Sequence, residues 1–299
     1  MSIEITCFKS YDIRGRLPDE LNNDIAYRVA KATAEFLDAK RIVIGRDIRE
    51  SSAQLAGAVA KGLTDAGVEV LDIGLGGTEM VYFATGQLQA DGGIMITASH
   101  NPADYNGLKL VRSGARPISG DTGLDDIRAI AERDERLQAE TPGHVNTVDI
   151  ADDYRDKLLS FVEVDNLKPL RIVANAGNGG AGLTVDLLES SLPFEFVKVH
   201  HEPDGSFPNG VPNPMLEENR ASTVEAIAAH GADFGIAWDG DFDRCFFFDE
   251  NGRFIEGYYI VGLLAEALLK HSPGSVIIYD PRLTWNTLET VAESGGRAV

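Results

Sequence analysis

Short apolar runs alternate with longer amphipathic stretches along most of the chain. Runs such as Arg41–Gly45 and Ile94–Ile96 have the length of buried strands, and in the stretches between them apolar residues recur every three or four positions. The clearest helical stretch is 21–37, whose apolar face would be formed by Ile25, Val29, Ala32 and Phe36. In the first half of the chain we expect strands at 3–8, 41–45, 68–73, 94–96 and 108–111, and helices at 21–37, 51–66, 78–88 and 124–136.

The same alternation continues in the second half. Expected helices are 152–162, 180–188, 221–230, 258–269 and 284–292, and expected strands are 170–174, 194–199, 233–238, 245–248, 253–255 and 276–279. The sequence Glu250-Asn251-Gly252 between two of these strands is typical of a hairpin turn. Strands that alternate with helices predict an α/β protein of repeated three-layer α/β/α domains, with mixed and mostly parallel sheets.

A polar stretch at 140–146, which contains Pro142 and Gly143, marks the first predicted domain boundary. After it the strand–helix pattern starts again near Ile172 and once more near Ile277. We therefore predict three domains, at 1–147, 148–256 and 257–299. The third range has room for only part of the pattern, so we expect an incomplete domain with an uncovered apolar sheet edge that favours self-association.

Composition and charge narrow the possible functions. The 299 residues include 27 Lys+Arg and 47 Asp+Glu, and the net charge of −20 disfavours binding to nucleic acid or to an anionic membrane. Two cysteines are too few for a disulfide framework, and the first residues lack the basic and apolar regions of a signal peptide. The most apolar helical stretch, 258–269, is too short to span a bilayer. We expect a cytoplasmic protein that is a monomer or a weak homodimer.

One predicted strand is followed by a concentration of reactive side chains. The run 93–96 leads into Thr97-Ala98-Ser99-His100-Asn101-Pro102, and Lys109 follows in a Gly-Leu-Lys sequence. Pro102 biases Asn101 toward an extended conformation, so Ser99 is expected on a loop at the carboxyl end of a strand, where open α/β sheets carry their chemistry. The same residues also allow an ordinary turn in which Ser, His and Asn cap backbone groups. No G-x-S-x-G sequence surrounds Ser99, which disfavours an α/β-hydrolase.

Three aspartates at alternate positions follow a later strand. Asp239, Asp241 and Asp243 would repel one another unless a cation lay among them, and their oxygens suit Mg²⁺ or Ca²⁺. An EF-hand would place Glu250 at the last ligand position of a calcium loop. That alternative is disfavoured, because Arg244 stands where the loop requires glycine and the flanking segments are predicted strands. A metal site is favoured over a solvated acidic turn.

Two further motifs are weaker. The run Gly177–Gly182 matches G-x-G-x-x-G, after a predicted strand and at the start of a helix, as in dinucleotide-binding folds. No acidic residue stands cleanly at the end of the next strand to bind a ribose, so a tight packing turn is favoured, with a dinucleotide-binding α/β protein as the alternative. The run Tyr11–Gly15 places Arg14 on a loop, where it would suit either a phosphate or a surface ion pair.

Together these motifs resemble those of the α-D-phosphohexomutases, closest to the bacterial phosphomannomutase/phosphoglucomutase branch. The resemblance is carried by 11–15, 97–102 and 239–244, and it runs along essentially the whole chain. It implies an isomerase that interconverts mannose 6-phosphate and mannose 1-phosphate through a phosphoserine and a hexose 1,6-bisphosphate. Glucose phosphate, as the main or a second substrate, is the alternative within the family.

The resemblance also implies roles for individual residues. Ser99 matches the phosphoserine, and the Mg²⁺ ligands are matched by Ser99 (through its phosphate), Asp239, Asp241 and Asp243. Catalytic roles are implied for Arg14, His100, Lys109 and Arg244, and substrate contacts for Tyr11, Asn101 and Arg282. The family's sugar-selecting loop and its fourth, phosphate-binding domain are not matched within this sequence. We therefore expect weak turnover, or none, from this stretch alone.

Overall fold

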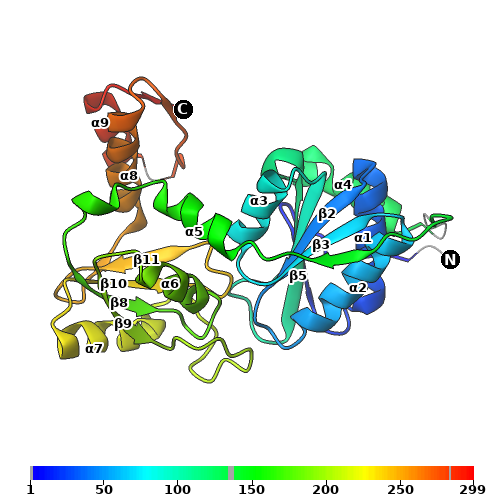
Figure 1. The fold of residues 1–299 in the computed structure, drawn as a ribbon, viewed down its shortest axis with the longest axis horizontal. Coiled ribbons are helices and arrows are strands. Elements are labelled where there is room, and N and C mark those ends of the chain that lie inside the picture. The colour runs from blue at the N-terminus through cyan, green and yellow to red at the C-terminus, as the bar shows by residue number, and fades with distance from the viewer. Residues whose placement is uncertain (1–2, 134–137, 283) are drawn as a thin grey trace.

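Two large sheets and a small third one organise the part of the protein that the structure describes (Figure 1). The structure is a computed structural model that describes residues 3–133, 138–282 and 284–299. We call the parts built on these sheets the first, second and third units. The sheets lie within 1–147, 148–256 and 257–299 respectively, and the division of the chain into domains at those limits stays a proposal.

The first unit is a mixed sheet covered by helices. Its strand order is β1-β5-β4-β2-β3-β7, with β6 paired to β5; β2, β3, β4 and β7 are parallel, and β5 is antiparallel to β1 and β4. The strands are β1 (Ile13–Arg16), β2 (Arg41–Arg46), β3 (Glu69–Leu75), β4 (Gly92–Ile96), β5 (Tyr105–Arg112), β6 (Arg116–Pro117) and β7 (Val145–Thr147). The helices are α1 (Asn23–Leu37), α2 (Ser52–Asp65), α3 (Thr78–Gln87) and α4 (Leu124–Ala131).

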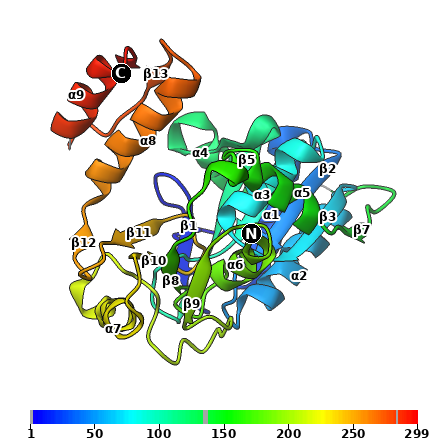
Figure 2. The same ribbon diagram turned by 60° about the vertical axis from the view of Figure 1, so that its left-hand side comes forward.

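The second sheet has the order β12-β11-β10-β8-β9 and is also mixed. Its unit contains α5 (Ala151–Leu159), β8 (Arg171–Asn175), α6 (Ala181–Glu189), β9 (Glu195–Val199), α7 (Ala221–His230), β10 (Phe234–Trp238), β11 (Cys245–Phe248) and β12 (Phe254–Ile255). The third unit contains α8 (Gly257–His271), β13 (Val276–Ile277), α9 (Trp285–Glu293) and β14 (Arg297–Ala298). Figure 2 shows α8 and α9 standing apart from the first sheet.

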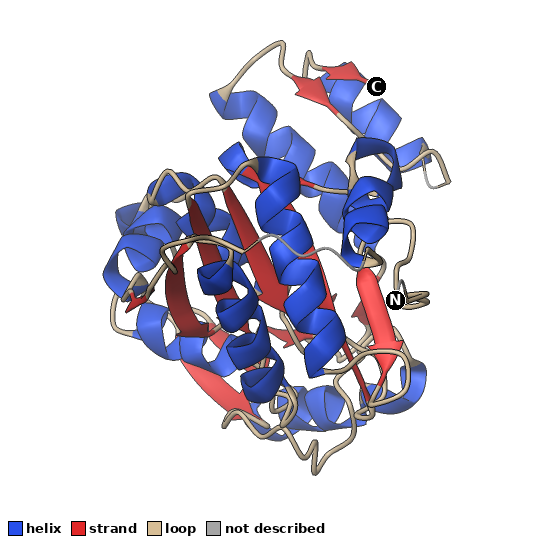
Figure 3. Cartoon of the chain, turned by 90° about the vertical axis from the view of Figure 1, so that its right-hand side faces the viewer, coloured by secondary structure: helices blue, strands red, loops and turns tan. Residues whose placement is uncertain are grey.

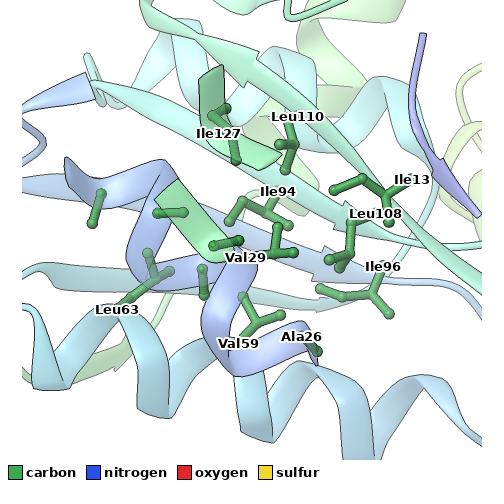
Figure 4. Packing of buried hydrophobic residues seen from close by; sticks show 14 of the residues in the cluster. Ile13, Ala26, Val29, Val59, Leu63, Ile94, Ile96, Leu108, Leu110 and Ile127 are labelled. Atoms are coloured by element: carbon green, nitrogen blue, oxygen red, sulfur yellow. The ribbon is translucent and has the colours of Figure 1, made fainter. Parts of the chain in front are cut away.

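The core of the first unit explains why its strands are continuous apolar runs. Neighbouring residues of one strand pack on opposite faces: Ile94 and Ile96 join one buried cluster, and Met95 joins another. The first cluster lies against α1, α2 and α4, as Figure 4 shows for Val29, Val59 and Ile127, and the second lies against α3. Helices therefore cover both faces of the sheet (Figure 3). This arrangement confirms the predicted α/β fold class.

The predicted strand at 3–8 is wrong, apart from a single bridge between Phe8 and Ile13. Its alternating pattern is real, because Ile5 and Cys7 are fully buried. However, the backbone N–H of Ile5 donates to the side chain of Glu132 instead of to a neighbouring strand. The sheet edge is formed instead by β1, which the sequence pattern did not predict.

Two other expectations change at the end of the first unit. The polar stretch at 140–146 was predicted to be a boundary only, yet β7 begins at Val145 and pairs in parallel with β3. Its three residues are exposed. The strand therefore has no buried face whose apolar pattern could have predicted it. The helix predicted at 124–136 ends at Ala131, and positions 134–136 lie outside the described residues.

Apolar side chains are exposed over the third unit. Leu263, Leu268 and Trp285 on its two helices are more than half exposed, and Ile278 beside β13 is 83% exposed. Because these side chains lie mainly on helices, they do not test the predicted uncovered sheet edge, which stays a prediction together with self-association through it. Among the described residues, no helix is both long enough and apolar enough to cross a membrane.

Replacing Ile94 by alanine should destabilise the first unit. Ile94 is fully buried in the centre of the sheet, so the variant loses transfer free energy and leaves a cavity, together about 2–5 kcal/mol. Urea unfolding followed by circular dichroism measures the loss in the free energy of unfolding. The matched control is Ile278→Ala, which should change it by less than about 0.5 kcal/mol; equal effects of the two changes would contradict the assignment of the core.

Candidate active site

Ser99 lies in a tight loop between β4 and β5. Its φ of +53° is in the left-handed region that favours glycine, and only 1% of its surface is exposed. The backbone N–H of Ser99 donates to Thr97 Oγ1 at 2.8 Å. A serine keeps this conformation only when its surroundings hold it there, so the contacts around the loop determine where its hydroxyl points.

The loop after β10 meets the Ser99 loop directly. Ser99 Oγ donates to Asp239 Oδ2 over 2.5 Å. The backbone of Gly240 approaches so closely that a β-carbon there would lie 2.7 Å from the carbonyl oxygen of Ser99. Glycine is required at this position for the two loops to touch. The first and second units thus meet at the serine. The sequence pattern predicted the two strand-end loops separately and did not predict their contact.

The three aspartates gather at this contact. Asp239, Asp241 and Asp243 each place a carboxylate oxygen within 4.8 Å of the others, and the first two are completely buried. Lys109 Nζ lies 2.6 Å from both Asp241 Oδ2 and Asp243 Oδ2, and Thr78 Oγ1 donates to Asp241 Oδ2 at 2.6 Å. Asp241 Oδ1 is buried and has no hydrogen-bond donor among the described residues. A clustered set of hard oxygen donors with one unpartnered acceptor fits a Mg²⁺ ion.

The two buried aspartates differ in electrostatic environment. Burial, reinforced by the negative charge of Asp241, raises the pKa of Asp239 to about 6. Burial alone would also raise the pKa of Asp241, but the attraction and hydrogen bond of Lys109 outweigh it and lower that pKa to about 2. Asp241 therefore stays ionised to a lower pH than Asp239. Asp239 accepts a hydrogen bond from the Ser99 hydroxyl and becomes protonated in mild acid.

Arg244 and His100 complete the surroundings of the serine oxygen. Arg244 Nη2 lies 2.5 Å from Ser99 Oγ and also contacts Asp239 Oδ2 and His100 Nδ1. His100 Nδ1 itself is 3.2 Å from Ser99 Oγ. Burial, followed by the positive charges of Arg244 and Arg14, lowers the pKa of His100. The imidazole is therefore neutral at pH 7, and its Nδ1 accepts the hydrogen bond from Arg244.

Two of the remaining predicted residues join this cluster and two do not. Arg14 Nη1 donates to Asn101 Oδ1 at 2.5 Å, and Arg14 Nε pairs with Asp12 at 2.8 Å, so Arg14 contacts the Ser99 loop through Asn101. Tyr11 is 82% exposed beside them. Arg282 is in the third unit, where its guanidinium pairs with Asp280, and the structure does not bring it to the cluster. The roles of all these residues stay predictions.

Two residues at the site were missed from the sequence. Thr78 opens α3 directly after Gly76-Gly77, and this strand-to-helix turn was the available signal. Arg49 follows β2, at the same sheet edge as the Ser99 loop, and donates to the carbonyl oxygens of Ser99 and Asn101 at 2.8 and 2.6 Å. Its position after a parallel strand was the only clue.

The geometry around the glycine-rich turn and the acidic loop supports neither a dinucleotide site nor an EF-hand. A β-carbon on Gly180 would lie 2.7 Å from the ring of Phe242, and one on Gly77 would lie 2.3 Å from it. Protein therefore fills the space beside the glycine-rich turn at 177–182, as expected of a packing turn. The EF-hand interpretation is wrong, because strands β10 and β11 flank the acidic loop. Glu250 lies in the following hairpin turn and is not among the clustered carboxylates.

Comparison with known proteins decides the family. Residues 6–138 match the family model described as Phosphoglucomutase/phosphomannomutase, alpha/beta/alpha domain I. Residues 152–252 match the model of the corresponding domain II. The chain belongs to the phosphoglucomutase/phosphomannomutase family. The resemblance predicted from the sequence motifs is confirmed.

Relatives of this family member are similar along nearly the whole chain. It is 57% identical to a phosphomannomutase of Salmonella typhimurium, over 99% of the chain and 66% of the relative. It is 59% identical to a protein named phosphohexose mutases of Xanthomonas campestris pv. campestris, over 98% and 65% respectively. A crystal structure of a phosphoglucomutase/phosphomannomutase family protein from Burkholderia thailandensis matches with a TM-score of 0.89 and 35% identity, over 99% and 66%. The chain spans slightly less than two thirds of the length of these relatives.

Replacing Asp239 by asparagine should weaken Mg²⁺ binding while the fold is kept. The change preserves the shape of the side chain but removes one buried charge, and a hydrogen-bonded or ligating charge contributes about 1.5–3 kcal/mol, which corresponds to a loss of roughly tenfold to hundredfold in affinity. Isothermal titration calorimetry with Mg²⁺ measures the loss. Glu250→Gln is the control, because this residue would bind metal only in an EF-hand; weaker binding in that variant alone would reject the proposed ligand set.

Mg²⁺ affinity should also fall as the pH is lowered through 6. The pKa of Asp239 is raised to about 6, so this side chain is charged at neutral pH and protonated in mild acid. A proton and the cation compete for the same oxygen, so affinity should drop by up to about tenfold for each pH unit below the pKa. Titrations at several pH values measure the slope, and Asp239→Asn should flatten it. The same steep slope in that variant would assign the titration to another group.

Proposed function

We propose that Ser99 carries a phosphoryl group, and that the whole protein is a phosphomannomutase that transfers this group to and from a hexose monophosphate. The observation that carries the proposal is the position of Ser99 Oγ, within 2.5 Å of both Asp239 Oδ2 and Arg244 Nη2. A phosphate on this oxygen would have a metal-ligating carboxylate on one side and a guanidinium on the other. The phosphomannomutases among the relatives support mannose phosphate as the substrate.

Three cations reach the Ser99 loop and the acidic cluster from different elements. Arg14 comes from β1, Lys109 from β5 and Arg244 from the loop before β11. Phosphoryl transfer depends mainly on positioning and on neutralising the charge of the transferring group. When bound, Mg²⁺ supplies part of that neutralisation at the three aspartates. The three side chains would supply the rest locally, although the protein as a whole has a net charge of −20.

The proposed transfer balances in atoms and protons. The bond from Ser99 Oγ to phosphorus breaks, a bond from a sugar hydroxyl oxygen to phosphorus forms, and the hydroxyl proton ends on Ser99 Oγ. The hexose 1,6-bisphosphate then returns its other phosphate to the serine and leaves as the isomeric monophosphate. We expect neutral His100, whose Nδ1 is 3.2 Å from Ser99 Oγ, to assist the proton transfer.

There are two alternatives to this proposal. In the first, glucose phosphate is the main or a second substrate and uses the same serine and metal site. For either sugar, the expectation of weak turnover from this stretch alone stays a prediction. A dinucleotide-binding function at the Gly177 turn has less support, because Phe242 and neighbouring backbone fill the space around its glycines. Tight binding of NADH, measured by fluorescence, would favour that function.

Incubation with glucose 1,6-bisphosphate and Mg²⁺ should add one phosphate to Ser99. The bisphosphate donates to the free hydroxyl held between Asp239 and Arg244. Intact-mass measurement followed by peptide mapping detects the modification. Ser99→Ala should remain unlabelled, whereas Ser113→Ala, a change at an exposed serine of the same unit, should be labelled at the wild-type rate.

Two results together would reject the proposal. They are the absence of label on Ser99 in wild-type protein and unchanged metal binding in Asp239→Ala. Label found on another serine would reject the assignment of Ser99 and leave the family membership intact. Label on Ser99 followed by release to mannose 6-phosphate but not to glucose 6-phosphate would favour the mannose enzyme over its glucose counterpart.

A further inference from the structure

The side chain of Arg49 is buried against the loop that carries Ser99. The residue is 3% exposed and follows β2. Its guanidinium donates four hydrogen bonds to backbone carbonyl oxygens, those of Ser99 (2.8 Å), Asn101 (2.6 Å), Pro102 (2.7 Å) and Tyr105 (3.0 Å). All four belong to the segment between β4 and the start of β5. One planar side chain thus fixes the path of the whole Ser99 loop.

A counter-charge holds the guanidinium in place. Asp47 is 3% exposed, and its Oδ2 lies 3.3 Å from Arg49 Nε. The carboxylate also accepts from Ser52 Oγ at 2.5 Å and from the backbone N–H of Arg49 at 3.1 Å. A buried ion pair with these additional hydrogen bonds has a defined position. Among the described residues Arg49 Nε has no hydrogen-bond partner, so its contact with Asp47 is ionic. The guanidinium is therefore held by the charge of Asp47 on one side and by hydrogen bonds to the Ser99 loop on the other.

The second unit packs on the same guanidinium. The ring of Phe207 lies over Arg49, with 5.3 Å from its centroid to Cζ, and is itself 7% exposed. Gly205 approaches so closely that a β-carbon there would lie 2.2 Å from the carbonyl oxygen of Ile48. The segment 204–209 is anchored in turn to Asn178, through Asp204 N–H at 2.9 Å and Asn209 Nδ2 at 2.8 Å. A continuous set of contacts leads from the Gly177 turn to the Ser99 loop.

We propose that Arg49 is a positioning residue for Ser99, and that Phe207 of the second unit keeps its guanidinium aligned. The inference rests on the proposed function of Ser99 as the phosphoryl carrier. Arg49 contacts the carbonyl oxygen of Ser99 and not its hydroxyl, so it acts through the backbone. Because Ser99 has left-handed backbone geometry, a loop released from Arg49 relaxes toward ordinary conformations and turns the hydroxyl away from Asp239 and Arg244.

The first experiment compares Arg49→Lys and Arg49→Met with wild-type protein. We expect both variants to be phosphorylated at Ser99 by glucose 1,6-bisphosphate roughly ten- to hundredfold more slowly, since small misplacements of reacting groups have effects of that size. Lysine keeps the charge but cannot reproduce the planar set of four bonds. Mg²⁺ affinity should be unchanged. The matched control is Arg41→Met, which removes an exposed guanidinium from the other end of β2 and should be labelled at the wild-type rate.

Hydrogen exchange separates positioning from a merely structural role. Amide exchange of residues 98–103 should accelerate in the Arg49 variants, while exchange in β4 and α1 stays as in wild type. Phe207→Leu should change labelling and loop exchange in the same direction but less, and Phe161→Leu, a change at an exposed ring, should change neither. If Arg49→Met does not fold, Arg49→Lys and Phe207→Leu carry the test.

Labelling at the wild-type rate in the Arg49 variants would overturn the inference. Slow labelling with unchanged loop exchange would also overturn it, because a structural role alone would then account for the loss. If wild-type protein accepts no phosphate, the proposed function fails, and hydrogen exchange decides the Arg49 inference on its own. In that case faster exchange confined to 98–103 supports the positioning of the loop, and unchanged exchange rejects it.

Discussion

The structure depends on how it accommodates two completely buried aspartates on one loop. Removal of Asp239 and Asp241 from water is strongly unfavourable unless each finds a cation or a hydrogen-bond donor. For Asp241 these partners, Lys109 and Thr78, come from the first unit, although the aspartate belongs to the second. The charges that the proposed chemistry uses therefore also hold the two units in register. They leave one oxygen, Asp241 Oδ1, available to a metal ion.

Much of this arrangement could be predicted because the signals are local. Buried parallel strands are continuous apolar runs, so β2, β4 and β8 were evident, and the Glu250-Asn251-Gly252 turn gave the β11–β12 hairpin. The reactive side chains of the site are also concentrated in two short loops that follow strands. Since one loop combines serine, histidine and asparagine and the other carries three aspartates, the sequence predicts the serine and the acidic cluster but not the contact between them.

The rest could not be predicted, because periodicity reports burial and does not identify hydrogen-bond partners. The segment 3–8 alternates like a strand, yet the N–H of Ile5 pairs with the Glu132 side chain. The part that Thr78 plays depends on a carboxylate more than a hundred residues away. Arg49 bonds to carbonyl oxygens, which every residue possesses, so nothing in the sequence of the Ser99 loop marks it as a partner.

The ring of Phe242, which stands where Gly77 and Gly180 have no side chains, makes the surroundings of the acidic loop depend on both units. Phe242 and Asp241 lie on the same loop, and both reach their final surroundings only when the first and second units dock. The acidic loop therefore has its buried surroundings only together with Lys109 and Thr78, which belong to the first unit. The site is thus shared between the two units, and neither unit by itself contains all of its residues.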